Sequence, residues 1–196
     1  MEFDVQEYQN LLRSAVKKNS VIESDMDDII KKGIDNIFFV GCGGSLAIST
    51  PPLYILQLNS KIPGFILNSD EFNTMKPKTL SKNSLVILLS SSGSTPETLK
   101  AAELAKSLGC TTIGISTCSN PTLAQHVEYA YYQQAKGAGY NEFKLTILYQ
   151  IIFYLLYKLE GVSYYEELLP ALMLVPDHLI NLHQKTDTLS SEFADR

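Results

Sequence analysis

The sequence predicts an α/β protein: a three-layer αβα sandwich built on a five-stranded parallel sheet of flavodoxin-like order 2-1-3-4-5. Two observations predict this class. Short apolar runs alternate along the chain with segments whose apolar residues recur at helical spacing, which is the pattern of a parallel sheet covered on both faces. Two of these runs end in turns rich in glycine and serine, each followed at once by helix-forming sequence. Right-handed crossovers then restrict the order of the strands.

Composition narrows the class of protein. The 196 residues suit one domain with a sizeable core, and the net charge of −5 without a Lys/Arg run argues against nucleic acid as the main partner. The acidic N-terminus predicts no signal peptide, and the most apolar segment, Leu145–Leu156, is too short to span a bilayer. We therefore expect a cytoplasmic protein with no membrane partner. The three cysteines lack paired spacing and the three histidines lack ligand spacing, so free thiols, no metal and no other cofactor are expected.

Two helices are expected before the first strand, forming an N-terminal segment over residues 1–33. Phe3–Lys18 carries apolar residues at helical spacing. Ser24–Lys32 is expected to begin with Ser24 as its cap, because acidic residues follow in the first turn, and to end at Gly33. The first strand is then Ile34–Val40.

The main domain is expected over residues 34–161, followed by a C-terminal helical segment over 162–196. Its further strands are Phe65–Leu67, Leu85–Leu89, Thr111–Ser116 and Val127–Tyr131. Its first helix is expected from Leu46, with a late start or a kink at Pro51 and Pro52. The next is Thr98–Leu108, which places Ala101, Leu104, Ala105 and Leu108 on one face. A short helical turn at Thr122–His126 and, after a break at Gly137–Tyr140, a long helix over Asn141–Leu159 follow. Beyond it, Tyr164–Lys185 is expected to be helical with interruptions at Pro170 and Pro176. For the polar tail, Thr186–Arg196, two alternatives stay open: it continues a helix or it frays.

The turn after the third strand, Ser90–Thr95, is the most informative stretch, and we call it the serine turn. Its hydroxyl residues precede Pro96, which suits the first turn of a helix because its missing N–H would be unpaired there. A helix N-terminus leaves N–H groups free and carries partial positive charge, so the turn predicts an anion-binding site, most often for phosphate. The alternative is that Ser94 or Thr95 simply caps the helix.

The turn after the first strand, Gly41–Ser45, is the second candidate, and we call it the glycine turn. Its glycines allow close approach of a ligand, and Ser45 stands where a helix begins. It lacks the G-x-G-x-x-G dinucleotide fingerprint. In the predicted strand order, strands 1 and 3 are neighbours, and the crevice between their connections is where open α/β sheets bind ligands. Two anion-friendly turns are therefore expected to converge on one site.

These residues resemble a known family. FFVGCGGSLA followed by LLSSSGSTPETLKAAELAKSLG is similar to the sugar isomerase (SIS) domain. NSDEF at Asn68–Phe72 further resembles the Ser–Glu–Phe after the second strand in the isomerase half of glucosamine-6-phosphate synthase and in fructosamine-6-phosphate deglycases. The similarity covers roughly Ile34 to Gly161.

The resemblance implies that the chain binds a sugar phosphate or a fructosamine 6-phosphate. Ser45, Ser90, Ser92 and Thr95 would hold the phosphate. The family often has Gln at Ser91 and Glu at Ser94, which affects fine specificity more than the phosphate site. The full set of expected substrate-binding residues is Gly43, Gly44, Ser45, Ser90, Ser91, Ser92, Gly93, Ser94, Thr95 and Glu142.

The catalytic groups are not assigned. Isomerisation needs a base, typically a carboxylate, and often a His for ring opening. In the two-domain relatives the second SIS domain supplies both, so the chain resembles an N-terminal half that leads toward a second SIS domain. Glu142 could reach the site or merely favour a helix N-terminus, and Glu71 and Glu97 have the same alternative. Lys144 could contact the sugar or be solvated.

Three functions remain open from the sequence. The first is the substrate-holding half of a sugar-phosphate isomerase or deglycase. The second is a non-catalytic phosphosugar sensor, and the third, less favoured by the sequence, is an FMN-type electron carrier. The apolar, Tyr-rich Leu145–Tyr157 helix carries more apolar surface than one face of a sheet needs to cover, which predicts a homodimer or a higher homo-oligomer.

Overall fold

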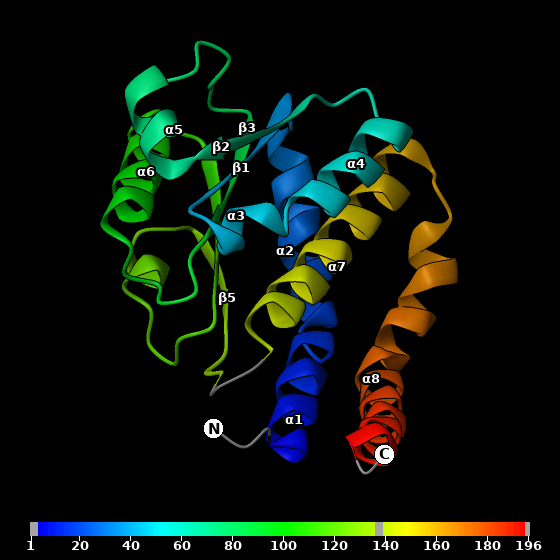
Figure 1. The fold of residues 1–196 in the computed structure, drawn as a ribbon. Helices are drawn as coiled ribbons and strands as arrows, with labels where there is room; N and C mark the ends of the chain where they lie inside the picture. The colour runs from blue at the N-terminus through cyan, green and yellow to red at the C-terminus, as the bar shows by residue number, and fades with distance from the viewer. Residues whose placement is uncertain (1–3, 136–138, 195–196) are drawn as a thin grey trace.

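The predicted strand order is confirmed. The computed structural model describes the backbone of residues 4–135 and 139–194, so the predicted helix start at Phe3 and the predicted break at Gly137 lie outside the described residues. The five strands pair in parallel in the order β2-β1-β3-β4-β5 (Figure 1). Their bounds are β1 Asn36–Gly41, β2 Gly64–Asn68, β3 Ser84–Leu89, β4 Thr111–Ser116 and β5 Tyr129–Tyr132.

Helices cover both faces of the sheet, as expected for buried parallel strands. Side chains alternate along β1: Ile37 and Phe39 enter one core cluster, whereas Phe38 and Val40 enter the other. The first cluster lies under α1 (Val5–Val16), α2 (Asn19–Lys32), α4 (Thr50–Asn59) and α7 (Tyr140–Glu160). The second lies under α5 (Ser69–Met75) and α6 (Pro96–Ser107), on the opposite side in Figure 1.

The three strands at the centre of the site end together. Gly41, the last residue of β1, is in register with Leu89 of β3 and with Asn68 of β2. A Cβ added to Gly41 would lie 2.8 Å from the carbonyl oxygen of Leu89, so the two strand ends approach too closely for a side chain here. The glycine turn and the serine turn therefore leave the sheet at the same edge.

The long apolar helix α7 is enclosed by its own chain. It contacts α1, α2, α4 and α8 (Tyr164–Ala194), and most of its side chains from Phe143 to Leu156 are buried. The amide of Gln150 in its middle donates to the carbonyl oxygens of Ala15 and Thr146. The reason for expecting a subunit interface at α7 was therefore wrong, because helices of this chain supply the cover. The oligomeric state itself stays a prediction.

Prolines shape two helices differently. A four-residue helix, α3 (Gly44–Ala47), precedes α4, whose first turn contains Pro51 and Pro52; the predicted delayed start is confirmed. In contrast, α8 (Tyr164–Ala194) runs through Pro170 and Pro176, so the predicted interruptions were wrong; the polar tail continues the helix as far as Ala194, which is one of its two expected outcomes. Each proline removes one helical N–H, and the turns on either side still close.

Two other details differ from expectation. The helix α2 begins at Asn19, with Lys18 at its N-cap making no side-chain bond, so Ser24 lies inside the helix and is not its cap. Burial of Ile22 extends this helix toward its N-terminus, which is a packing effect that local cap residues do not report. Leu108, expected on the buried face of this helix, is the C-cap residue after α6 and is 45% exposed, whereas Ala102 in the middle of α6 is buried. The short turn appears as the 3-10 helix η1 (Thr122–Gln125).

The helix α5 starts with a reciprocal capping box. The side chain of Asn68 accepts from the N–H of Asp70, and the carboxylate of Glu71 accepts from the N–H of Asn68 at 3.1 Å. Glu71 therefore satisfies the backbone of α5, which confirms the structural alternative for this carboxylate. The box sets the direction in which the chain leaves β2.

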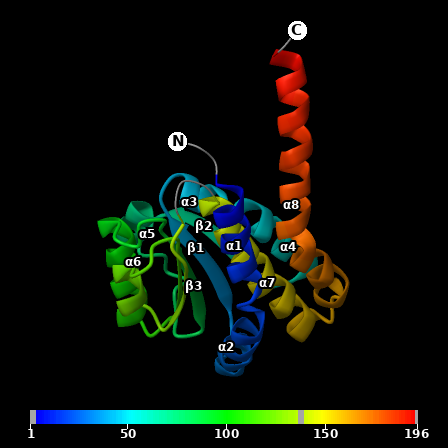
Figure 2. The same ribbon diagram turned by 90° about the horizontal axis from the view of Figure 1, so that it is seen from below.

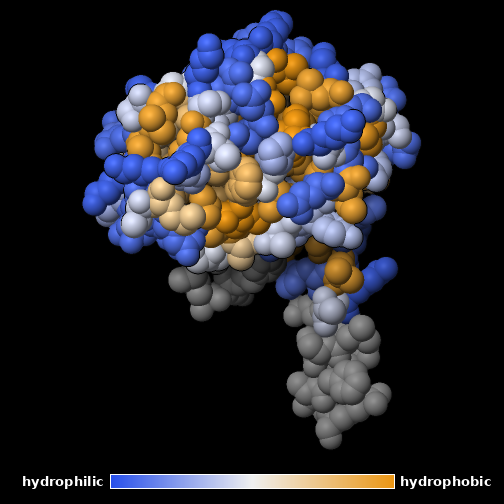
Figure 3. All heavy atoms as spheres, turned by 90° about the horizontal axis from the view of Figure 1, so that it is seen from above, coloured by the Kyte–Doolittle hydropathy of each residue, from blue (hydrophilic) through white to orange (hydrophobic). Residues whose placement is uncertain are grey.

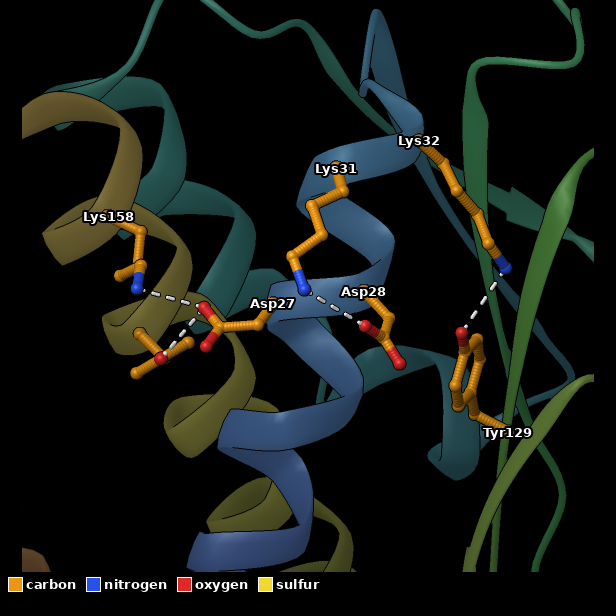
Figure 4. A network of polar contacts seen from close by, with 7 residues as sticks. Asp27, Asp28, Lys31, Lys32, Tyr129 and Lys158 are labelled. Carbon is orange, nitrogen blue, oxygen red and sulfur yellow. Dashed lines mark hydrogen bonds and ion pairs between the residues drawn. The ribbon is translucent and has the colours of Figure 1, made fainter.

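Ion pairs fasten α2 to its neighbours. Lys158 of α7 pairs with Asp27 of α2 at 2.9 Å, and Tyr154 donates to the same carboxylate (Figure 4). On the other side of α2, Lys32 donates to the hydroxyl of Tyr129 on β5 and pairs with Glu128. These pairs are partly exposed, so water and salt screen them and each stabilises the fold only weakly.

The surface carries scattered apolar residues. On the face seen in Figure 3, hydrophobic residues lie in patches bordered by hydrophilic ones. The C-terminal part of α8 extends away from the body (Figure 2).

Among the described residues, no helix has the length and apolarity needed to cross a membrane. All three cysteines are free thiols, as predicted.

We predict that Asn68→Ala lowers the free energy of unfolding by about 1 kcal/mol, because α5 loses its cap. Urea denaturation measures this, with Thr74→Ala as the control, since Thr74 is an exposed residue of the same helix. Equal effects of the two variants would contradict the role of the cap.

Candidate functional site

The hydroxyl of Ser90 holds the serine turn together. Ser90 is buried, and its Oγ accepts the N–H of Gly93 at 3.0 Å and lies 2.9 Å from Thr95 Oγ1. The backbone N–H of Ser90 donates to Ile115 of β4. The turn is therefore closed by its own first hydroxyl and anchored to the adjacent strand.

The end of β4 fastens the next residue of the turn. The carbonyl oxygen of Ser91 accepts from the N–H of Thr117 and the hydroxyl of Ser116, both at 3.2 Å. The hydroxyl of Thr117 adds a third contact at 3.3 Å. With its carbonyl held from β4, Ser91 presents its side chain toward the glycine turn.

The hydroxyls of the serine turn do not cap α6 in the usual way. Thr95 is the N-cap residue, but its side chain makes no bond to the helix backbone and its hydroxyl faces Ser90. Ser94 is exposed, and its N–H contacts Ser92 Oγ at 3.3 Å. The capping alternative for Ser94 or Thr95 was therefore wrong, and the first turn of α6 starts without a side-chain cap, which leaves its N–H groups available to an anion.

Gly93 makes the tight turn possible. Its φ is +65°, a left-handed conformation that side chains rarely adopt. A Cβ here would lie 2.1 Å from Pro121 Cβ and 2.9 Å from Ser116 Oγ. The segment before η1 therefore packs directly against the serine turn.

The glycine turn faces the serine turn from the end of β1. Gly43 has a φ of +54° and stands before α3, whereas Gly44 has no atom within 4 Å of an added Cβ. Ser45, in α3, brings its Oγ to 3.2 Å from Ser91 Oγ. The two turns therefore converge as predicted, and they meet through the hydroxyl groups of Ser45 and Ser91.

Lys144 joins this hydroxyl pair. Its Nζ donates to Ser45 Oγ at 2.9 Å and to Ser91 Oγ at 2.6 Å, and the residue is fully buried. The sequence left two alternatives for Lys144, contact with the sugar or solvation, and its burial shows that the solvated alternative was wrong. A signal was present, because Lys144 falls on the buried stripe that Ile147, Leu148 and Ile151 continue at helical spacing.

The ammonium of Lys144 has no carboxylate partner. Within the described part of the chain, no Asp or Glu oxygen lies within 4 Å of its Nζ. Burial lowers the pKa of Lys144 to about 8, and the charge of Glu142 opposes this shift. The site is therefore built around a buried cation that, among the residues that the structure describes, donates to the hydroxyls of Ser45 and Ser91.

Glu142, the one carboxylate expected in the site, points elsewhere. It is exposed in the first turn of α7 and accepts a long contact of 3.4 Å from the hydroxyl of Tyr8 on α1. Burial raises the pKa of Tyr8 to about 12, with Glu142 adding to the effect. Among residues 4–135 and 139–194, no three His, Cys, Asp or Glu side chains gather as metal ligands would.

Two turns from neighbouring parallel strands, converging at the switch point of a 2-1-3-4-5 sheet, define the class as an α/β protein with a candidate site where the two strands end. The family model of the SIS domain matches residues 29–155, and the chain belongs to this family.

Two curated relatives are similar in sequence to this chain. The fructosamine deglycase FrlB of Bacillus subtilis is 37% identical over 162 residues, which cover 82% of this chain and 49% of that protein. The fructoselysine 6-phosphate deglycase of Escherichia coli is 25% identical over 148 residues, covering 76% of this chain and 42% of that protein. The chain thus spans about half the length of these curated relatives or less.

Solved structures show the same fold. A candidate phosphosugar isomerase of Bacillus subtilis is 35% identical with a TM-score of 0.76, over 89% of this chain and 54% of that one. A candidate phosphosugar isomerase of Salmonella typhimurium is 30% identical with a TM-score of 0.78, over 90% and 54% of the respective chains.

We predict that Gly93→Ala lowers the free energy of unfolding by about 3 kcal/mol, through the left-handed backbone and the clash with Pro121. Gly44→Ala is the control, and should change it by less than about 1 kcal/mol because the space is open. Urea denaturation of both variants measures the difference; similar losses would show that the packing of Gly93 is not the cause.

We predict a pH-dependent stability difference between the wild type and Lys144→Met. The pKa of Lys144 is about 8 when folded, against its ordinary value of 10.5. Between these two values the unfolded chain binds more protons, so the wild-type stability rises with pH relative to the variant, by about 2–3 kcal/mol in all. Chemical denaturation without ligand from pH 7 to 10.5 measures it. A pH-independent difference would contradict the burial of a charged Lys144.

Proposed function

We propose that this chain binds the phosphate of a sugar phosphate, as the substrate-holding part of a sugar-phosphate isomerase or a fructosamine-6-phosphate deglycase. The observation that carries the proposal is the convergence of two turns on one point: Ser45 of the glycine turn and Ser91 of the serine turn share the Nζ of Lys144. A site that gathers hydroxyl donors, a helix N-terminus and an ammonium has the chemistry for an anion.

Each part of the site has a role in this proposal. The hydroxyls of Ser45, Ser90, Ser92 and Thr95 would donate to phosphate oxygens, together with the uncapped N–H groups at the start of α6. The open space at Gly43 and Gly44 would let phosphate approach the backbone, while Gly93 keeps the turn tight. Ser91 and Ser94 would affect the fine specificity of the site, that is, which sugar phosphate it binds best. Glu142 would meet the sugar only if its carboxylate turned away from Tyr8.

The substrate class comes from the relatives. Those named above are a fructosamine deglycase, a fructoselysine 6-phosphate deglycase and candidate phosphosugar isomerases. These names favour an enzyme over the non-catalytic sensor. We keep fructose 6-phosphate and a fructosamine 6-phosphate as the two substrate types to test.

The chemistry itself would need groups beyond the two turns. Neither turn contains a carboxylate or a histidine that could serve as base or acid. We propose, as the family resemblance implies, that these groups belong to a second SIS domain toward which residues 162–196 lead, or to a second copy of the chain. Cytoplasmic location and homo-oligomerisation remain part of this proposal.

The test removes hydroxyls without breaking the turn. We predict that Ser92→Ala combined with Thr95→Val abolishes the thermal shift produced by millimolar fructose 6-phosphate, because two phosphate donors are lost. Thr95→Val keeps the side-chain shape, and no cap bond is lost since Thr95 makes none. Because Thr95→Val also removes the 2.9 Å contact with the buried Ser90 Oγ, the melting temperature without ligand should fall slightly, and the thermal shift is measured from that lower value.

Ser107→Ala is the matched control, since Ser107 is an exposed hydroxyl at the far end of α6. It should keep the full thermal shift. A double variant with an unchanged shift would overturn the proposed phosphate site. Turnover of fructose 6-phosphate or a fructosamine 6-phosphate by the chain would separate an enzyme from a sensor.

A further inference from the structure

We propose that Lys144 supplies the counter-charge for the bound phosphate, so that the site selects a dianion and takes up a proton when it binds one at alkaline pH. This proposal rests on the proposed phosphate site and goes beyond it by naming the residue that makes binding depend on the charge of the ligand.

The first argument is an unmatched charge. Other lysines that contact neighbouring elements are partly exposed and pair with a carboxylate: Lys158 with Asp27 (Figure 4) and Lys32 with Glu128. Lys144 is fully buried, and in the described residues no carboxylate lies within 4 Å of its Nζ. Buried charges in proteins are as a rule paired, because desolvation is otherwise uncompensated. An anionic ligand would provide the missing partner.

The second argument is the direction of the hydrogen bonds. An ammonium only donates, so Ser45 Oγ and Ser91 Oγ must both accept from a charged Lys144. One of the two hydroxyls can donate to the other, since their oxygens are 3.2 Å apart. The remaining O–H has its hydrogen turned away from the lysine, and the ammonium has a third N–H beyond the two that these hydroxyls accept. Lys144 thereby orients the hydroxyls as donors for a ligand.

The third argument is the small number of competing charges. Glu142, on α7 itself, is the carboxylate whose charge bears on Lys144, and Tyr8 of α1 is the titratable group that faces Glu142. The glycine turn and the serine turn face Lys144 with the hydroxyls of Ser45 and Ser91. A bound dianion would therefore add a strong negative charge where only a distant one acts now.

The consequence is a coupling between binding and protonation. Burial holds the pKa of Lys144 at about 8 in the empty site. A phosphate dianion beside the ammonium raises that pKa, and the second pKa of a phosphate monoester is about 6. Affinity is therefore highest between about pH 6 and 8, and falls about tenfold per pH unit above 8 until the bound-state pKa is reached.

Isothermal titration calorimetry with fructose 6-phosphate tests this on the whole chain at pH 7, 8 and 9, with fructose as the uncharged comparison. Each titration is run in two buffers of different ionisation enthalpy, which measures protons taken up. We expect wild-type uptake of about half a proton at pH 8. We expect Lys144→Met to bind at least about 30-fold more weakly at pH 7, with no pH dependence from pH 7 to 9.

Lys100→Met is the control, because Lys100 is an exposed lysine on α6, the helix that starts at the serine turn. It should keep wild-type affinity and uptake; an equal loss would indicate a general charge effect and overturn the role of Lys144. Lys144→Gln serves as a second neutral variant if Lys144→Met does not fold.

The outcomes separate the two proposals. Binding with pH-independent affinity, without proton uptake, or with wild-type strength in the neutral variants overturns the role of Lys144 and leaves the phosphate site standing. If the wild type binds neither fructose 6-phosphate nor inorganic phosphate, both proposals are wrong.

Discussion

The parallel pairing of β1 with β3 is the constraint on which the candidate site depends. It places Gly41 beside Leu89, so the chain leaves both strands at the same height of the sheet. The strand order reverses at this pair, and helices α3 and α6 therefore start on either side of one crevice. A register shift of one residue would turn the buried side chains of β3 to the wrong face and separate the two turns.

Helix α7 brings the charge to this crevice at a cost in stability. Its apolar side chains fill the layer between the sheet and α8. Its first turns place the ammonium of Lys144 within hydrogen-bond distance of the hydroxyls of Ser45 and Ser91. A methionine there would fit the same buried stripe without desolvating an ammonium. An uncompensated buried cation is a feature that packing alone does not explain, and binding sites commonly sacrifice stability in this way.

Much of the fold could be predicted because its signals are local. The apolar runs of β3 and β4, the glycine that ends α7 and the prolines of α4 act through neighbouring residues, and the structure has them where the sequence indicates. The errors came from packing. Ile22 extends α2 past its expected cap, and α8 continues through two prolines. Neither effect can be deduced from cap or breaker residues alone.

The sequence by itself determined the fold class, the strand order and the two turns, because the hydrophobic period and the choice of turn residues depend on residues that are neighbours in the chain. It also determined which hydroxyls were available. Only the tertiary structure decided what each does: Thr95 turns to Ser90 and leaves α6 uncapped, Glu142 faces Tyr8, and Lys144 joins the turns from 53 residues beyond Ser91. Contacts between segments so far apart depend on how the layers pack, and no local pattern specifies them.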